Sequence, residues 1–277
     1  MSNLTIIDGH SYIYGAFYGV LDKASTKNKI RMDAVYGFFA LLRVIIKKFP
    51  KNKLFIVFDS KKWFQEKLQE KKSQELKELR SLIDQQMIVQ KLLNKVNIKW
   101  VQYSKIKADN IIASLAKSWA KKGDKVQISS GDYDFVQLIS KDISLARNLH
   151  GLITLHDVKF IKQKFGIKPE QYVDFQAMVG DENDSFSGIP GIGPKTAAKL
   201  LNEYKNIAGI YKSINKIPAS IAEKLKSHKS LVLKNQKNIP MTDNIALKEF
   251  IKGKLPDVDQ KKVSQNINSL LSSIGIE

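Results

Sequence analysis

Seven aspartates are the residues of this chain whose type and spacing could do chemistry. They are Asp8, Asp59, Asp109, Asp132, Asp134, Asp181 and Asp184. Taken singly, each is better explained as a helix N-cap or a surface charge. Taken as one group, so many carboxylates repel one another unless divalent cations neutralise them, and their hard oxygen ligands suit Mg²⁺ or Mn²⁺. Two such ions about 4 Å apart can activate water and stabilise the leaving oxygen when a phosphodiester is cleaved.

Three of these acids follow short apolar runs that are typical of buried strands. The pairs of strand and acid are Leu4–Ile7 with Asp8, Lys53–Phe58 with Asp59, and Lys125–Ser130 with Asp132. Strands that alternate with helices form a mostly parallel sheet covered on both faces, and ligands of such sheets lie beyond the carboxyl ends of the strands. We therefore expect these three acids, which are distant in sequence, to converge in space.

Other patterns extend this α/β interpretation over residues 1–165. Helices are predicted at 34–49, 61–96 and 108–121, and further short strands at 99–102, 143–145 and 152–155. The segment 61–96 is rich in Lys, Glu, Gln and Leu and is predicted to form one or two exposed helices. From about residue 166 the pattern is helical, which predicts a second, helical domain over 166–277.

A glycine-rich segment of the second region joins two predicted helices by a tight hairpin. Its sequence runs from Gly188 to Thr196 as GIPGIGPKT and includes Gly191, Gly193 and Lys195. Glycines permit positive φ and keep side chains away, so the amides that begin the second helix, together with Lys195, can meet a phosphate. An ordinary interhelical turn is the alternative. The length of this motif and its position between apolar helices favour the phosphate-binding interpretation. A loop that binds phosphates in this way reads no base.

The composition of the chain favours a polyanionic partner. Lys and Arg number 46 against 27 Asp and Glu, for a net charge of +19, and each cation placed against a phosphate releases a counterion. Part of this excess is a general bias towards Lys along the chain. The absence of Cys excludes disulfides and thiolate metal sites and fits a reducing compartment. Without a secretory signal pattern or an apolar stretch of membrane-spanning length, a cytoplasmic protein that enters no membrane is expected.

Together these motifs resemble the 5′ nuclease family, which includes the 5′–3′ exonuclease domain of bacterial DNA polymerase I, phage 5′ nucleases and flap endonucleases. The resemblance is carried, in family order, by residues 7–14 (IDGHSYIY), 57–59 (VFD), 108–109 (AD), 130–134 (SGDYD) and 180–197. It spans residues from about 4 to 201. Because no polymerase segment follows, the chain is similar to a stand-alone member.

The resemblance implies a PIN- or resolvase-like catalytic domain over 1–165 and a helical domain with a helix–hairpin–helix (H3TH) motif over 166–277. It also implies divalent-metal-dependent cutting of DNA that carries a 5′ flap, nick or overhang. The hairpin from Gly188 to Lys195 would grip the duplex behind the cut, with room for a K⁺ ion on its backbone carbonyls.

The same resemblance implies roles for the acids and for the helices near the cut. One Mg²⁺ or Mn²⁺ ion would be held by Asp132, Asp134 and Asp181, with Asp184 nearby, and the other by Asp8, Asp59 and Asp109.

Helices within about 61–96 would form an arch through which a 5′ single strand passes. In the family this arch carries an Arg, a Tyr-Lys pair and an Arg-Pro-Pro stretch. This chain has Gln65, Lys71, Lys72 and Glu75 in roughly those places, and Lys71 and Lys72 are the cations expected to contact DNA there.

Two further departures fall among the acids. Where the family has Glu-Ala-Asp-Asp, this chain has Lys107-Ala108-Asp109-Asn110, so one carboxylate is replaced by a cation and another by an amide. The ammonium of Lys107 could take the space, and supply the charge, of one metal ion while leaving the other ion in place.

Three functions are compatible with the sequence. The first is a 5′–3′ exonuclease and flap endonuclease with reduced activity, and the second is a degenerate homologue that binds branched or nicked DNA without cutting. Resemblance to the family favours the first, whereas Lys107, Asn110 and the altered arch favour the second. A PIN-type RNA nuclease shares the strand-end acids but lacks the hairpin and is disfavoured. The expected partner is DNA, with a separate DNA polymerase as a further candidate, and the expected state is a monomer.

Overall fold

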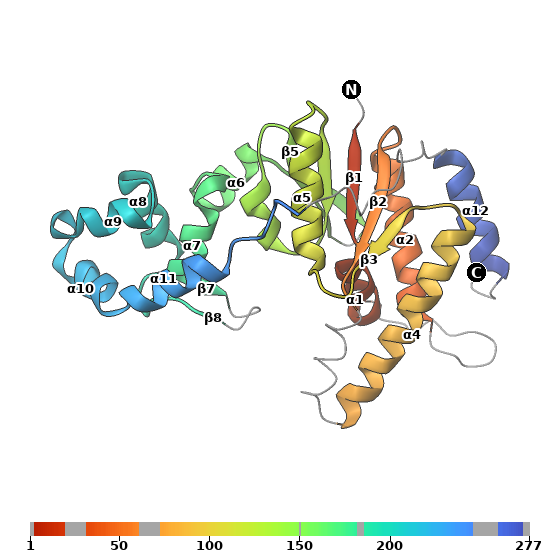
Figure 1. The fold of residues 1–277 in the computed structure, drawn as a ribbon, viewed down its shortest axis with the longest axis horizontal. Helices are drawn as coiled ribbons and strands as arrows, with labels where there is room; N and C mark the ends of the chain where they lie inside the picture. The colour runs from red at the N-terminus through yellow and green to blue at the C-terminus, as the bar shows by residue number, and fades with distance from the viewer. Residues whose placement is uncertain are drawn as a thin grey trace. The chain divides into compact units, whose positions relative to one another are not determined.

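The fold was analysed in a computed structural model that describes residues 3–19, 32–60, 73–149, 151–181, 186–245 and 260–273. The chain forms two compact units (Figure 1). The first unit combines residues 1–135, 145–155 and 242–277, and the second combines 136–144 and 156–241. The predicted boundary near residue 165 stays a prediction, and the two units are described separately.

Among the described residues, the larger sheet contains six strands in the order β3-β2-β1-β4-β5-β6. The strands are β1 (Leu4–Asp8), β2 (Lys53–Phe58), β3 (Trp100–Gln102), β4 (Val126–Ser129), β5 (Ile143–Leu149) and β6 (Leu152–His156). The central strand β1 pairs in parallel with both β2 and β4, and β2 pairs in parallel with β3. The prediction of a mostly parallel α/β sheet is therefore confirmed, and each predicted strand is present.

Helices cover both faces of this sheet. They are α1 (Gly9–Gly19), α2 (Asp33–Lys48), α4 (Ser73–Lys95), α5 (Ala108–Ala120) and α12 (Gln260–Ser273). Ile7 of β1 packs in the cluster formed by α1, α2 and α4, whereas α5 contacts β1, β2 and β4 without contributing to that cluster. Since successive strand residues point to opposite faces, α5 covers the face of β1 opposite to Ile7. Helices α2, α4 and α12 lie together (Figure 1).

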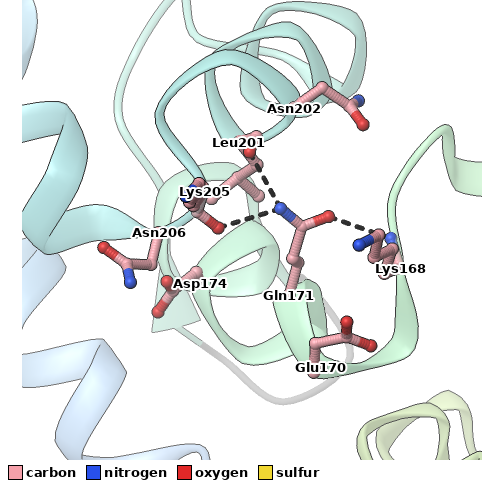
Figure 2. Close-up of a pocket in the computed structure, with 8 residues that line it drawn as sticks. All are labelled: Lys168, Glu170, Gln171, Asp174, Leu201, Asn202, Lys205 and Asn206. Carbon is pink, nitrogen blue, oxygen red and sulfur yellow. Dashed lines mark hydrogen bonds between the residues drawn. The ribbon is translucent and has the colours of Figure 1, made fainter.

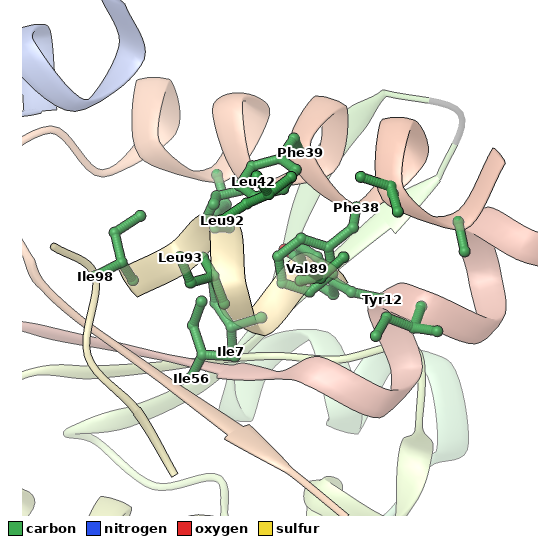
Figure 3. Packing of buried hydrophobic residues seen from close by; sticks show 14 of the residues in the cluster. Ile7, Tyr12, Phe38, Phe39, Leu42, Ile56, Val89, Leu92, Leu93 and Ile98 are labelled. Carbon is green, nitrogen blue, oxygen red and sulfur yellow. The ribbon is translucent and has the colours of Figure 1, made fainter. Parts of the chain in front are cut away.

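The main core of the first unit lies between the sheet and helices α2 and α4. Figure 3 shows Val89, Leu92 and Leu93 of α4 packed with Phe38 of α2 and Ile56 of β2. The prediction that 61–96 forms exposed helices is therefore wrong for the second part of this segment. Apolar residues spaced by three or four keep one stripe of α4 buried, although Lys, Glu and Gln dominate its composition.

Helix α1 was not predicted, and it begins directly where β1 ends. Gly9 allows the start of α1 to pack closely against Phe58 of β2, because a Cβ atom there would collide with the ring of Phe58. Tyr12 fastens α1 to the sheet through a 2.7 Å hydrogen bond between its hydroxyl and Ser129 Oγ on β4. The short connection fixes the residues that immediately follow Asp8.

The C-terminal part of the chain also belongs to the first unit. Segment 242–245 runs along α5: Thr242 N donates to Asn110 Oδ1 at 2.9 Å, and Ile245 N donates to Ser114 Oγ at 3.2 Å. Between them, Asp243 forms an ion pair with Lys117. Asn110, Ser114 and Lys117 are three or four residues apart, so one stripe of α5 holds this segment.

The second unit is mainly helical, as predicted. Its α-helices are α6 (Val158–Phe165), α7 (Tyr172–Val179), α8 (Pro194–Tyr204), α9 (Ile207–Lys212), α10 (Ala219–Ser227) and α11 (Lys229–Asn238). Strands β7 (Gly180–Asp181) and β8 (Phe186–Ser187) form a small antiparallel pair between α7 and α8. The buried amide of Asn235 on α11 donates to the carbonyls of Ala177 and Ser187 and so ties α11 to α7 and β8.

The described helices include none that is both long enough and apolar enough to span a bilayer.

Candidate functional site

The first predicted site lies at the carboxyl edge of the central strands. Asp8 is the last residue of β1, Asp59 directly follows β2, and Asp132 follows β4 after two residues. Since β1 pairs in parallel with β2 and β4, these strand ends share one edge of the sheet. Asp109 joins them from the first turn of α5.

Asp8 lies at the centre of this group. Its Oδ1 accepts a hydrogen bond from Ser11 N at 3.0 Å, and its Oδ2 accepts one from Ser130 Oγ at 2.7 Å. Burial, and then the charges of Asp109 and Asp59, raise the pKa of Asp8 to about 7 in spite of these two hydrogen bonds. The site therefore contains more negative charge than its own donors stabilise.

Lys107 supplies a positive charge at this place. Its Nζ forms an ion pair with Asp109. Burial alone lowers the pKa of Lys107, but Asp109, Asp59 and Asp132 together raise it above its usual value, so the ammonium remains charged. In return, the charge of Lys107 lowers the pKa values of Asp109 and Asp59 and so offsets part of the increase that burial causes.

Helix α5 is fixed to β2 through Asp59. Ala108 N donates to Asp59 Oδ1 at 3.0 Å, so one oxygen of this carboxylate caps the helix that carries Asp109. Gln102 Nε2 of β3 donates to the backbone carbonyl of Asp59 at 2.6 Å. Asp59 therefore accepts a hydrogen bond from the first amide of α5 and also lies beside Lys107 and Asp109.

The loop that carries Asp132 and Asp134 is held by hydrogen bonds. Asp132 N donates to Ser130 Oγ at 3.0 Å, and Asp134 N donates to Asp132 Oδ1 at 2.7 Å. Gly131 N donates to Ser11 Oγ at 2.8 Å. Ser130 thus links Asp132 to Asp8, because the same hydroxyl donates to the carboxylate of Asp8.

The chemistry of these side chains fits a hard divalent cation. Buried carboxylates with raised pKa values are the donors that such a cation would stabilise. Within the ranges that the structure describes, however, no three carboxylate or imidazole side chains are arranged to hold a metal ion. The ammonium of Lys107 engages Asp109, one of the predicted ligands.

His10 is a further neighbour of these acids. Burial lowers the pKa of its imidazole to about 4, with Asp109 opposing the shift and Lys107 adding to it. The ring lies 4.4 Å from that of Tyr14, centroid to centroid. His10 is therefore a neutral, half-buried ring at neutral pH.

The remaining predicted acids are Asp181 and Asp184. Asp181 lies in β7 of the second unit, where Gln176 Nε2 donates to its Oδ2 at 3.1 Å. Asp184, Gln65, Lys71 and Lys72 fall outside the described residues. That Asp181 and Asp184 join Asp132 and Asp134 around one ion stays a prediction.

The glycine-rich hairpin of the second unit is the other predicted site. Gly191 has φ of +76° and is exposed, as are Gly193 and Lys195. Ile189 and Ile192 are buried beneath the turn, and Ile189 N donates to Met178 O on α7 at 2.7 Å. The apolar side chains thus anchor the turn while its backbone and Lys195 face solvent.

Two features of this hairpin were predicted only in part. Gly188 packs so closely against the end of α7 that a Cβ atom would collide with the Val179 carbonyl. Lys224 of α10 donates from Nζ to Gly191 O at 3.4 Å and adds a cation that the sequence analysis did not single out. Thr196, in the first turn of α8, is partly buried.

A separate pocket lies at the end of α8. It has a volume of about 460 Å³ and contains none of the predicted site residues. Figure 2 shows Gln171 at its centre, where Nε2 donates to the carbonyls of Leu201 and Lys205 and Oε1 accepts from Lys168 N. These bonds cap the end of α8, so Gln171 has a structural role here.

The fold and the strand-end acids together define an α/β protein that also carries a small, mainly helical unit. Residues 3–166 match the family model described as 5′-3′ exonuclease, N-terminal resolvase-like domain, and residues 167–263 match 5′-3′ exonuclease, C-terminal SAM fold. The chain therefore belongs to the 5′–3′ exonuclease family.

Individual relatives agree with this assignment. The 5′-3′ exonuclease of Buchnera aphidicola subsp. Acyrthosiphon pisum (strain APS) is 36% identical, over 84% of this chain and 78% of the relative. The 5′-3′ exonuclease of Aquifex aeolicus (strain VF5) is 32% identical, over 99% of this chain and 96% of the relative. The bacteriophage T5 D15 flap endonuclease, solved with DNA and metal ions, has the same fold, with a TM-score of 0.67 and 16% identity over 98% of this chain and 99% of the T5 chain.

Proposed function

We propose that this protein is a divalent-metal-assisted 5′–3′ exonuclease and flap endonuclease acting on DNA, with activity attenuated by Lys107. Membership of the 5′–3′ exonuclease family supports the reaction. The observation that carries the attenuation is the ion pair of Lys107 with Asp109 at the edge of the sheet where Asp8 and Asp59 end their strands.

The residues divide into two groups in this proposal. Asp132, Asp134 and Asp181, with Asp184, hold one Mg²⁺ or Mn²⁺ ion. Asp8, Asp59 and Asp109 form the second group. There the ammonium of Lys107 takes part of the place of a second metal ion, so that ion does not fully occupy its site. The chemistry that a divalent ion supplies in such a site is charge stabilisation of the attacking water and the leaving oxygen.

The chain's own residues supply the rest. Ser130 holds Asp8 and the backbone of Asp132 in a fixed relation, so these acids need little reorganisation when a phosphodiester binds. The exposed amides and Lys195 of the hairpin bind the duplex backbone without reading bases, and its carbonyls are the place for a K⁺ ion. The first unit acts as the catalytic domain, and the second unit, which carries the hairpin, acts as the DNA-binding domain.

The partner in this proposal is a DNA duplex with a 5′ flap, nick or overhang, bound by a monomer. The T5 flap endonuclease of the same fold was solved with DNA and metal ions, which supports this class of substrate. A separate DNA polymerase is the proposed protein partner, because relatives 31% identical to this chain are polymerases that match it over 27% of their length.

A second candidate is a protein that binds branched DNA without cutting it. Lys107 favours this alternative because a fixed cation among the acids competes with metal. Purified protein is incubated with a 5′-flap duplex and Mg²⁺ or Mn²⁺, and with Asp132→Ala as the control. Metal-dependent product from the wild type alone supports the nuclease. Tight flap binding with no product under either metal overturns it in favour of the binding protein.

A further inference from the structure

Arg147, near the end of β5, contacts the loop of Asp132 and Asp134 at two points. Its Nη2 donates to the carbonyl oxygen of Gly131 at 2.6 Å. The carbon of its guanidinium lies 3.8 Å from the centroid of the Tyr133 ring. Gly131 precedes Asp132, and Tyr133 separates Asp132 from Asp134, so these two contacts bracket the first acid and adjoin the second.

The peptide groups of Gly131 are restrained from two directions. Its N–H donates to Ser11 Oγ on α1 at 2.8 Å, and its carbonyl accepts from Arg147 on β5. Rotation of the backbone between Gly131 and Asp132 would break the bond to Arg147 and turn the Asp132 carboxylate. The hydrogen bond from Arg147 therefore restrains the peptide group that immediately precedes Asp132.

The contacts of Arg147 are of the strong kinds. A short charge-assisted hydrogen bond and a guanidinium stacked on an aromatic ring each exceed an ordinary neutral contact in strength. Arg147 Nε, in contrast, is buried and has no hydrogen-bond partner among the residues that the structure describes. Because burying that N–H is unfavourable, the Gly131 and Tyr133 contacts must hold the guanidinium in place.

We propose that Arg147 is a positioning residue that fixes the loop 131–134 so that Asp132 and Asp134 are presented together to the divalent cation. The inference rests on the proposed function, since it takes these two acids to be metal ligands. Arg147 acts through Gly131 and Tyr133 and touches neither the cation nor the substrate in this role. Removal of such supporting contacts commonly weakens metal binding by roughly 10- to 100-fold.

The test measures Mn²⁺ binding by the full chain without DNA, from the electron paramagnetic resonance signal of free Mn²⁺. Arg147→Met removes the donors and the charge but keeps an unbranched side chain, and Tyr133→Leu removes the ring. We expect each to weaken Mn²⁺ binding roughly tenfold. If the two effects were independent, the double variant would lose about 100-fold in Mn²⁺ affinity. We expect a much smaller loss, because both changes break the same stack of Arg147 on Tyr133. Tyr133→Phe keeps the ring that Arg147 stacks on and is expected to bind Mn²⁺ more tightly than Tyr133→Leu does.

Controls separate positioning from general damage. Arg43→Met removes an exposed arginine on α2 and is expected to leave Mn²⁺ binding unchanged. Arg147→Lys keeps a charge and a donor but not the planar group, and is expected to recover only part of the affinity. Thermal unfolding identifies any variant that does not fold, and if Arg147→Met fails to fold, the Tyr133→Leu and Tyr133→Phe pair provides the comparison.

The outcomes distinguish this inference from the proposed function. If the wild type binds Mn²⁺, Asp132→Ala does not, and folded Arg147→Met and Tyr133→Leu bind within twofold of the wild type, the positioning role is overturned and the proposed function stands. If Asp132→Ala binds Mn²⁺ as tightly as the wild type, or the wild type binds none, the metal site itself is overturned and the inference with it.

Discussion

The strand-end acids and the glycine-rich hairpin depend on different parts of the polypeptide. At the acids, the proposed function depends on side-chain charge in a buried place, where Lys107 lowers the pKa values of Asp59 and Asp109 against the effect of burial. At the hairpin, the proposed duplex binding depends on exposed backbone that is held in place by buried Ile189 and Ile192. A single substitution can therefore change the chemistry of the first site, while the second tolerates side-chain changes as long as its glycines remain.

The largest effect is expected from Asp132→Ala, which should lower flap cleavage about 100-fold or more while leaving duplex affinity within about twofold. The loss arises because Asp132 belongs to the acids and not to the hairpin. Cleavage rate and duplex binding are measured on the same preparations. Asp124→Ala is the matched control, since Asp124 lies at the amino end of β4, at the opposite edge of the sheet. Equal losses of cutting and binding would remove the distinction between the two sites.

A gain of roughly tenfold in cleavage, equivalent to about 1.4 kcal/mol, is expected from Lys107→Glu combined with Asn110→Asp. Replacing the ammonium by a carboxylate removes the competitor for metal at Asp109. The Mg²⁺ concentration needed for half-maximal rate is measured for the pair and for each single change.

Asn110→Asp alone is the control for this gain. Its side-chain oxygen accepts from Thr242 N, and an aspartate keeps that acceptor, so this single change is expected to have little effect. Were the double variant no faster than the wild type at any Mg²⁺ concentration, Lys107 would not be what limits the rate.

At the hairpin, Gly191→Ala is expected to weaken duplex binding roughly fivefold, because φ of +76° is unfavourable for alanine and its Cβ would crowd Lys224. Binding to a nicked duplex is measured by fluorescence anisotropy. Gly123→Ala carries a similar strain, with φ of +86° in a turn after α5, and serves as the control. Similar losses for both variants would indicate general destabilisation instead of a binding role for the hairpin.

The smallest effect is expected from Lys195→Ala, a loss of roughly two- to threefold in duplex affinity. Affinity of the wild type should fall steeply with salt, and this variant should reduce the slope of log K against log salt by about one, the value for one lost phosphate contact. Lys51→Ala, which removes an exposed lysine before β2, should leave the slope unchanged. Salt-independent binding by the wild type would contradict phosphate contacts altogether.

The sequence was most informative where a local pattern determines the structure. Apolar runs that end in acids identified β1, β2 and β4, because a buried strand needs a continuous apolar run whatever lies beside it. The hairpin was found because Gly191 requires a conformation that other residues rarely adopt. Both signals can be read within a few residues.

Contacts between distant segments could not be predicted in this way. Ser11, Ser130 and Arg147 support the acids through hydrogen bonds that exist only once α1, β4 and β5 are together. The buried stripe of α4 was obscured by Lys and Glu on its other faces. The contact of Asn110 with Thr242 joins residues 132 positions apart, and no pattern near either one indicates it.

The path of the chain after the hairpin has a consequence for how the protein can be divided. Residues 242–245 lie along α5, and Val263 and Ile267 of α12 are buried in the same cluster as α2. The second unit is thus an insertion within the first, bounded on both sides by sequence that completes one core. A protein shortened at residue 241 would keep every predicted metal ligand and the whole hairpin. It would nevertheless leave an apolar surface of α2 exposed to water. Loss of activity in such a protein would therefore indicate misfolding and not a missing catalytic group.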